Sequence, residues 1–309
     1  MPPVRSESAA TVATDAGLRE PRFNVRDYAV LLKPRVMSLV VFTALVGLIL
    51  APAAVDALTA AIAVLCIAVG AGAAGAINMW YDRDIDREMT RTMDRPLPAG
   101  RLRPLPALVF GLTLAATSVA AMAALVNAVA AGLLALTIVY YVLVYTVWLK
   151  RRTPQNIVIG GASGALPPII GWAAASGDIG WGAVVLFAII FLWTPPHSWA
   201  LALFRKGDYD RAGVPMLPVV AGERSTKNHI LAYTCILVPV TLAPVAIGMS
   251  GVLYGVAALM LGAVLLRNAI RLWRAADSAG ARPLFFFTIL YLFLIFVALL
   301  VDRALPTVS

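Results

Sequence analysis

Nine uncharged, apolar stretches of about 20 residues each limit what this chain can fold into. A helix needs roughly that length to cross the hydrocarbon core of a bilayer, and the stretches lack the alternation of membrane barrel strands. The sequence therefore predicts an all-α integral membrane protein with nine transmembrane helices. The predicted spans lie near residues 36–55, 57–78, 105–126, 128–149, 156–177, 181–204, 230–249, 252–266 and 284–301.

The basic residues predict how these helices are oriented. The chain is 61% hydrophobic with a net charge of +9, and if every span crosses, 24 of its 25 lysines and arginines fall on one side of the membrane. Cytoplasmic loops are the ones enriched in Lys and Arg, so the N-terminus is expected in the cytoplasm. Topology explains the positive charge, and we expect the lipid bilayer and not nucleic acid as the partner.

The first 30 residues are charged throughout and contain no apolar core, so they do not read as a signal peptide. We expect a disordered or interfacial N-terminal tail over residues 1–30. Residues 31–303 are expected to form a single transmembrane domain.

The spacing of matching features predicts an internal repeat. Asp82 follows the second span and Asp208 the sixth, 126 residues apart, while Gly100 and Gly222 are separated by 122 residues. The pattern suggests two four-helix halves in parallel orientation, with the ninth span as an addition. Because transporters and related folds place sites between repeats, both acidic loops are expected at one cytoplasmic mouth.

The segment after the second span, NMWYDRDIDREMTRTMDRP (78–96), concentrates charge next to lipid. Asn78, Asp82 and Asp86 recur every four residues, so on a helix they share one face. Their oxygen atoms are ligands that suit Mg²⁺, which also keeps waters and substrate phosphates. Asp84 lies on the opposite face and is expected to pair with an arginine.

A solvated, salt-bridged helix end is the simple alternative for this segment. Two observations argue against it. Carboxylates four residues apart repel each other on a helix face, and Asn78 lies at membrane depth, where a polar side chain is costly. The arginines that follow suit a diphosphate, because guanidinium groups and a divalent metal neutralise a departing diphosphate. The apolar interior would shelter an isoprenoid tail, and the chemistry would be capture of an allylic cation.

The NxxxDxxxD pattern followed by MTRTMDRPLPAGRL (89–102) resembles the signature of the UbiA-type intramembrane prenyltransferases. That family has nine transmembrane helices with Asp-rich motifs after helices 2 and 6. The stretches LLKPRVMSLVVFTALVGL (31–48), YTVWLKRRTPQNIVIGGASGALPPIIGW (145–172) and TPPHSWALALFRKGDYDRAGVPMLPVVAG (194–222) are similar to the haem-farnesylating branch of the family. The similarity extends from about residue 31 to residue 301.

The resemblance implies roles for individual residues. Asp82 and Asp86 would be catalytic and, with Asn78, metal-binding. Phosphate contacts would fall on Arg91, Arg95 and Lys150. Asp208 would be the catalytic and metal-binding acid of the second motif, with Tyr209 beside it as a substrate contact. An acid expected four residues after Asp208 is replaced by Ala212, which puts a complete second metal site in doubt.

The chain has only two histidines, His197 and His229. His197 follows Pro195-Pro196 in the sixth span, where the helix is expected to be kinked or locally opened. A neutral imidazole is a good ligand for haem iron, so with the family resemblance both histidines are candidate haem contacts. An interhelical hydrogen bond is the alternative for His197, and Trp193 and Trp199 could either flank a porphyrin or pack between helices.

The resemblance implies conversion of haem B to haem O by transfer of farnesyl from farnesyl diphosphate to the 2-vinyl group, with Mg²⁺ as cofactor. Haem B would be a substrate, the enzyme would lie in the bacterial cytoplasmic membrane, and haem A synthase would be a partner. Two alternatives are a sister enzyme that prenylates an aromatic quinone precursor and a secondary transporter. The transporter is disfavoured because the carboxylates lie outside the apolar runs or at their ends.

Overall fold

The computed structural model describes residues 24–305, and this part of the chain is entirely helical apart from its connecting segments. The elements are α1 (Val25–Leu31), α2 (Pro34–Leu50), α3 (Ala57–Tyr81), η1 (Ile85–Arg87), α4 (Pro104–Leu125), α5 (Ala128–Val139), η2 (Tyr140–Leu149), α6 (Asn156–Ala165), α7 (Pro167–Ser176), α8 (Trp181–Phe204), α9 (Lys206–Arg211), α10 (Leu217–Val220), α11 (Gly222–Val240), α12 (Ala243–Ala246), α13 (Val252–Arg274) and α14 (Ala281–Ala304). The predicted all-α class is confirmed. Residues 1–23 of the tail predicted over residues 1–30 lie outside the described residues, whereas residues 25–30 belong to helix α1.

Over the described range, eight helical segments are long and apolar enough to cross a membrane. A ninth candidate is the pair α1 and α2, which meet at an angle of 52°. Helices are the expected solution here because a backbone within lipid must satisfy its own hydrogen bonds. The count of nine is therefore reached only if the bent pair is one span, and it stays a prediction.

Two polar residues between predicted spans, Asp56 and Asn127, act as helix caps. Asp56 precedes α3, and its carboxylate accepts hydrogen bonds from the backbone N–H groups of Leu58 and Thr59 at 3.1 and 3.0 Å. Asn127 precedes α5 and accepts from the N–H of Ala130 at 2.8 Å. Each cap satisfies donors that the first helical turn leaves unpaired, so these turns begin the next helix at once.

Two predicted spans differ from the structure. The fifth, expected over 156–177, matches one candidate span, Asn156–Ser176, but the helix is interrupted at Leu166 because Pro167 has no N–H to donate to the preceding turn. The seventh begins at Gly222, eight residues before the predicted start at Ile230. The prediction counted uncharged residues, so it missed the charged first turns of this helix.

The centre of the molecule is the contact between α2 and α7. A Cβ atom on Gly47 of α2 would lie 2.1 Å from the carbonyl oxygen of Pro168, and one on Gly171 of α7 would lie 1.9 Å from that of Ala44. The two backbones therefore approach closely only because both positions are glycine, as at other small-residue helix contacts in membranes. This contact joins two groups of helices, because α7 also packs on α5 and α8.

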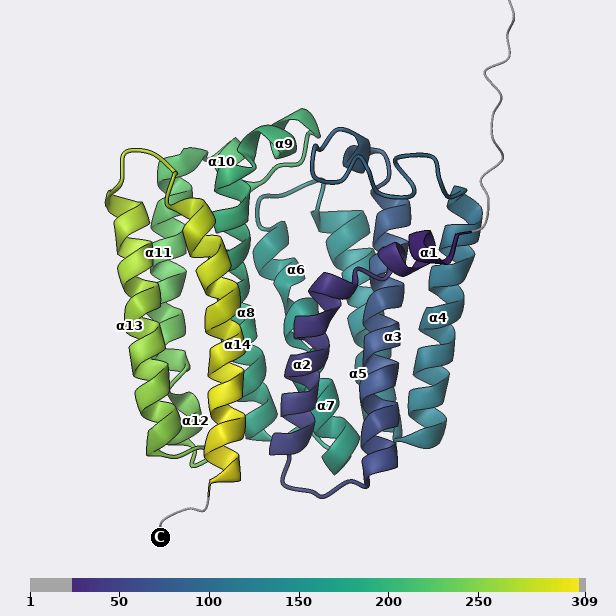
Figure 1. The fold of residues 1–309 in the computed structure, drawn as a ribbon, viewed down its shortest axis with the longest axis vertical. Helices are drawn as coiled ribbons and strands as arrows, with labels where there is room; N and C mark the ends of the chain where they lie inside the picture. Colours follow the sequence, from purple (N-terminus) through teal and green to yellow (C-terminus); the bar gives the residue numbers. More distant parts are fainter. Residues whose placement is uncertain (1–23, 306–309) are drawn as a thin grey trace, which may run out of the picture.

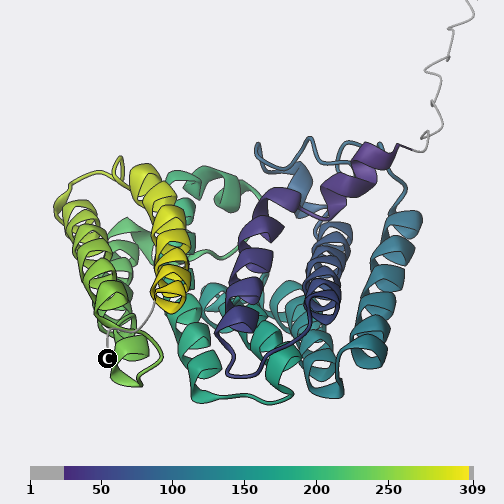
Figure 2. The ribbon, with the colours of Figure 1, turned by 60° about the horizontal axis from the view of Figure 1, so that its bottom comes forward.

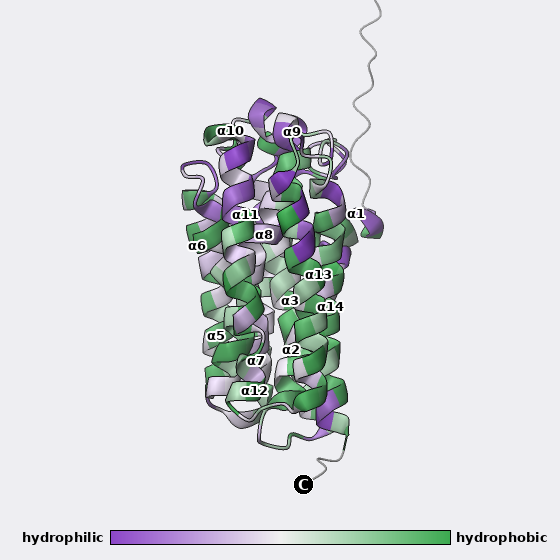
Figure 3. Cartoon of the chain, turned by 90° about the vertical axis from the view of Figure 1, so that its left-hand side faces the viewer, coloured by the Kyte–Doolittle hydropathy of each residue, from purple (hydrophilic) through white to green (hydrophobic). Residues whose placement is uncertain are grey.

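Figures 1 and 2 show α2 between α14 on one side and α3 on the other. The long segment after α3 and the segment containing α9 and α10 lie together at one end of the helices, which is the upper end in Figure 1. They touch there, because the hydroxyl of Thr90 donates to both carboxylate oxygens of Asp208 at 2.9 and 3.0 Å. Hydrophilic residues gather at this end (Figure 3), so both acidic loops share one mouth.

Candidate functional site

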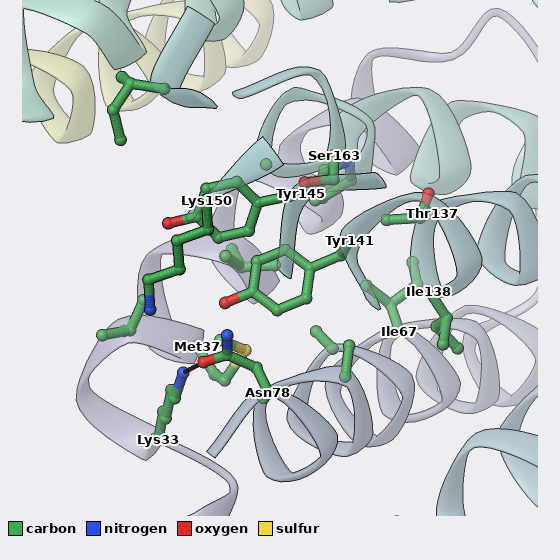
Figure 4. Close-up of a pocket in the computed structure, with 18 of the residues that line it drawn as sticks. Lys33, Met37, Ile67, Asn78, Thr137, Ile138, Tyr141, Tyr145, Lys150 and Ser163 are labelled. Carbon is green, nitrogen blue, oxygen red and sulfur yellow. Dashed lines mark hydrogen bonds between the residues drawn. The ribbon is translucent and has the colours of Figure 1, made fainter. Parts of the chain in front are cut away.

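The site begins at the end of α3, where Asn78 and Asp82 lie in contact and are both buried. The amide nitrogen of Asn78 donates to Asp82 Oδ2 at 2.7 Å and to the hydroxyl of Thr146 at 3.1 Å. Its carbonyl oxygen accepts from the amine of Lys33 at 2.7 Å (Figure 4). The costly polar residue at membrane depth is thus the centre of a hydrogen-bonded cluster.

Asp86 reaches the same place by a different route from the one predicted. The α-helix ends at Tyr81, so a continuous helical face through residue 86 is wrong. A further turn nevertheless forms, because the N–H of Asp86 donates to the carbonyl of Asp82 at 2.8 Å before the chain enters η1. The buried carboxylate of Asp86 then accepts from Arg95 at 2.6 Å.

A cavity of about 320 Å³, here called the mouth cavity, opens beside this cluster. Four basic side chains and one carboxylate line its polar end, namely Lys33, Arg91, Arg95, Lys150 and Asp86. Its deeper wall is apolar and includes Ile67, Leu134 and Ile138. A concave site with convergent charges at one end and an apolar interior is suited to an amphipathic anion.

Lys33 is a site residue that the sequence analysis missed. It lies between α1 and α2 with φ of 51°, and within residues 24–305 it is the sole non-glycine residue with positive φ. Such a conformation is uncommon outside glycine and is typically held in place by its surroundings. Here it brings the amine to Asn78, and Pro34 starts α2 immediately afterwards. The Lys-Pro pair was its one signal in the sequence.

The end of the fourth predicted span is a π-helix, η2, which widens the turn that precedes Lys150. Such turns are frequent at functional sites. It places the rings of Tyr141 and Tyr145 side by side at the cavity wall, with ring centroids 5.3 Å apart (Figure 4). The amine of Lys150 then reaches Asp82 Oδ2 as an ion pair.

Asp84 points away from the mouth cavity, as predicted. Arg151 donates to both of its oxygens at 2.7 Å, which confirms the expected arginine partner. These hydrogen bonds lower the pKa of Asp84 to about 2, so this pair is ionised at all physiological pH values. Its carboxylate is 61% exposed and belongs to the rim of the site.

The acid cluster fits a divalent cation in its chemistry. Asp82 Oδ1 is buried without a hydrogen-bond partner, although Arg151 lies 3.7 Å away, so an oxygen lone pair remains available. Carboxylate and carboxamide oxygens are hard ligands that Mg²⁺ accepts together with phosphate oxygens. In the described part of the chain, no three His, Cys, Asp or Glu side chains converge as a preformed metal site. The remaining ligands would therefore be the carboxamide of Asn78 and substrate phosphate.

The second acidic motif, Asp208-Tyr209, lies next to the mouth cavity. The ring of Tyr209 lines the cavity, whereas Asp208 accepts hydrogen bonds from Thr90 and, at 2.5 Å, from Arg211. The structure thus brings Tyr209 to the first cluster and leaves Asp208 joining the two loops. Its predicted part in metal binding stays a prediction.

The two predicted haem-contacting histidines lie in different surroundings. His197 lies in α8, which continues through both prolines without interruption, so the locally opened helix is wrong. It lines a second cavity of about 660 Å³, here called the side cavity, whose wall is formed by residues of α2, η2, α6, α8 and α14. His229 is exposed, and its ring contacts Ser225 and Trp199. Among the predicted tryptophans, Trp193 lines the side cavity and Trp199 is buried against α11.

The mouth and side cavities adjoin. Tyr141, Tyr145, Ser163 and Gly164 belong to the walls of both. Two molecules bound one in each cavity would therefore meet at these residues, within reach of the charged cluster.

Comparison with known proteins agrees with this arrangement. Residues 40–298 match the UbiA prenyltransferase family. The chain is 60% identical over 281 residues to the protoheme IX farnesyltransferase of Azorhizobium caulinodans. The aligned region covers 90% of this chain and 92% of that protein. The chain is 58% identical over 286 residues to the protein of the same name from Parvibaculum lavamentivorans, covering 91% and 90% of the two chains.

Solved structures share the fold at low sequence identity. A digeranylgeranylglyceryl phosphate synthase superposes with a TM-score of 0.75 at 17% identity, covering 90% of this chain and 98% of that one. A UbiA homologue from Archaeoglobus fulgidus bound to GPP and Mg²⁺ superposes with a TM-score of 0.62 at 16% identity, covering 88% and 99%. With a family match over most of its length and close relatives over nine-tenths of it, the chain belongs to the UbiA prenyltransferase family.

Proposed function

We propose that this enzyme transfers the farnesyl group of farnesyl diphosphate to the 2-vinyl group of haem B, which gives the hydroxyethylfarnesyl side chain of haem O. The observation that carries the proposal is the 55–60% identity, over at least 90% of the chain, to relatives named protoheme IX farnesyltransferase. The geometry supports it, because a basic, amphipathic cavity adjoins a larger apolar one.

The basic residues of the mouth cavity bind the diphosphate. The polar end of the mouth cavity carries four basic side chains and one carboxylate. Even when the carboxylate of Asp82, which pairs with Lys150, is included, the net charge of the cluster is positive. Hydrogen bonds between cations and phosphate oxygens are about twice as strong as neutral ones. Arg91, Arg95, Lys150 and Lys33 are therefore placed to hold the diphosphate and to stabilise the charge that develops as it departs.

The acids hold the metal that this chemistry uses. Asn78, Asp82 and Asp86 would bind Mg²⁺, and the bound ion supplies a Lewis acid for the departing diphosphate oxygen. The A. fulgidus homologue bound to Mg²⁺ and GPP supports divalent metal use in this fold. Lys150 and Arg95 fix the orientation of Asp82 and Asp86, because each forms an ion pair with one of the two carboxylates.

The aromatic wall guides the carbon chemistry. The C1–O bond of farnesyl diphosphate breaks and the diphosphate leaves, while the terminal vinyl carbon forms a bond to C1. Water then adds to the vinyl carbon next to the porphyrin and loses a proton. The rings of Tyr141 and Tyr145 flank the border between the cavities, where an aromatic face stabilises an allylic cation.

Haem B occupies the side cavity in this proposal. Of the two histidines predicted to contact haem, His197 lines that cavity, whereas His229 lines neither of the two cavities described. Trp193, which stacks on His197, adds a further aromatic surface to the cavity wall. We therefore keep His197 as the haem contact.

The proposal includes the membrane arrangement. Residues 31–303 form one transmembrane domain of nine spans, with α1 and α2 as the bent first span. The N-terminus and the mouth lie on the cytoplasmic side of the bacterial inner membrane, as the distribution of basic residues indicates. Product haem O would pass to haem A synthase, a membrane partner for which haem O is the substrate.

Purified enzyme supplied with farnesyl diphosphate, Mg²⁺ and haem B should produce haem O, identified by its mass. A parallel reaction replaces haem B with hydroxybenzoate, the acceptor of the aromatic prenyltransferases. Prenylated hydroxybenzoate without any haem O would contradict the proposal and favour the sister activity.

A further inference from the structure

The side cavity is large and mostly apolar. At about 660 Å³ it is twice the volume of the mouth cavity. Among residues 24–305, Arg35 is the one charged residue on its wall, and His197 is the one imidazole. A porphyrin has an apolar macrocycle, anionic propionates that an arginine can pair with, and an iron atom that requires a ligand.

The ring of His197 is fixed on both faces. Trp193 stacks on one side at 4.3 Å between ring centroids and Phe285 on the other at 4.6 Å, with interplanar angles of 15° and 23°. The ring therefore cannot rotate without disturbing two helices. Only its edge is left to meet a ligand.

Thr288 on α14 determines which nitrogen of His197 carries the proton. The Thr288 hydroxyl donates its single hydrogen to the carbonyl of Phe285 at 2.6 Å. With this hydrogen directed at Phe285, the hydroxyl accepts from His197 Nδ1, which lies 2.8 Å away. Nδ1 then carries the hydrogen in the neutral ring and Nε2 carries a free lone pair. Among residues 24–305, Nε2 has no hydrogen-bond partner.

Thr288 is itself held in place. Its side chain is fully buried, and its carbonyl oxygen accepts from the indole N–H of Trp193 at 2.7 Å. Trp193 and His197 are four residues apart on α8, so both point from one face of that helix to the same residue of α14. A histidine that binds a metal usually donates its other ring N–H to a nearby acceptor, and this hydrogen bond fixes the tautomer and the ring orientation.

We propose that His197 Nε2 is the axial ligand of the substrate haem iron in the side cavity, and that Thr288 is the positioning residue that fixes its tautomer. This rests on the proposed function. It extends that function from a histidine that contacts haem to a defined ligand atom, its support and a place for the macrocycle.

Gly164 marks where the macrocycle meets the prenyl donor. It lines both cavities, and a Cβ atom built on it would find no atom within 4 Å. A leucine at this position should fit the local backbone and project into the shared space. The space beside Gly160 and Gly161 on the same helix is instead occupied by the side chains of Tyr145 and Thr194. Of these three glycines, only Gly164 has open space beside it.

The test uses the full chain in detergent, loaded with haem B, and reads the absorption and resonance Raman bands of a histidine-ligated haem. His197→Ala should abolish these bands, and added imidazole should restore them. Thr288→Val, which keeps the shape but cannot accept, should weaken haem binding about 10–100-fold, as loss of such partners typically does. Thr288→Ser should restore it.

Thr234→Val is the matched control, because Thr234 is a buried threonine of α11 that bonds only its own helix at Ile230. It should bind haem as the wild type does. Histidine bands that survive His197→Ala, or equal losses in Thr288→Val and Thr234→Val, would overturn the inference. If the variants give those results while the wild-type enzyme forms haem O, the ligand assignment is refuted and the proposed function still stands.

Gly164→Leu adds a second measurement. It should keep the histidine-ligated haem bands while lowering haem O formation, because it separates the vinyl group from the prenyl donor. Full activity in Gly164→Leu would contradict the assigned meeting point of the two substrates.

Discussion

Asp82→Asn tests the acid cluster with the smallest change in shape. The carboxylate is 1% exposed, accepts from Asn78 and forms an ion pair with Lys150. An amide keeps the volume but removes the charge, so the variant loses an ionic partner for Lys150 and, in the proposed function, a metal ligand. A hydrogen bond to a charged group contributes about 1.5–3 kcal/mol, and the lost metal ligand adds to this. We expect kcat to fall at least about 100-fold, since each 1.36 kcal/mol is a factor of ten.

The assay is steady-state formation of haem O over a range of farnesyl diphosphate, Mg²⁺ and haem concentrations. The KM for haem should stay unchanged, because Asp82 does not line the side cavity. Asp84→Asn is the matched control, since the same substitution at an exposed carboxylate paired with Arg151 removes an interaction of about 1 kcal/mol or less. Asp82→Asn with wild-type kcat would refute the reasoning and reduce the cluster to a structural cap.

Three further outcomes follow from the same geometry. Lys33→Met should raise the KM for farnesyl diphosphate about 10–100-fold through loss of one charged hydrogen bond, with the KM for haem unchanged; equal KM values would remove Lys33 from the site. Leu134→Ala should open the apolar end of the mouth cavity and raise the use of geranylgeranyl over farnesyl diphosphate, measured by product mass, while a core truncation of this kind costs about 2–5 kcal/mol in the free energy of unfolding; unchanged donor preference would show that this residue does not limit chain length. The pKa of Asp84 is lowered from 3.8 to about 2, so its pair with Arg151 stabilises fully above pH 3.8 and is lost as pH falls through about 2; a melting curve of the detergent-solubilised protein should show this small loss in the wild type and not in Asp84→Asn.

The apolar runs predicted the helices well because crossing a bilayer imposes length and composition on each helix separately. The same reasoning could not place the break at Pro167 within an uncharged run, since prolines elsewhere, as in α8, do not interrupt the helix. Whether a proline interrupts a membrane helix depends on which neighbours satisfy the freed carbonyls. That information lies in the packing of helices distant in sequence.

The candidate site was predictable in part. The clustering of Asn78, Asp82 and Asp86 followed from spacing, although the helix ends at Tyr81 and a further turn completes the arrangement. Lys33 was missed because its role depends on a left-handed backbone conformation and a contact 45 residues away. Thr288 was missed for a similar reason, since its role depends on a hydrogen bond between its hydroxyl and His197 on another helix.

The most direct measurement follows the atoms of the reaction in the purified enzyme. Haem B and farnesyl diphosphate labelled with deuterium at C1 are combined with Mg²⁺ in water enriched in oxygen-18, and the haem product is analysed by mass spectrometry. We expect one product that carries both the deuterium and one oxygen-18, formed together with an equal amount of diphosphate. A haem product without oxygen-18, or diphosphate released with no farnesylated haem, would contradict it.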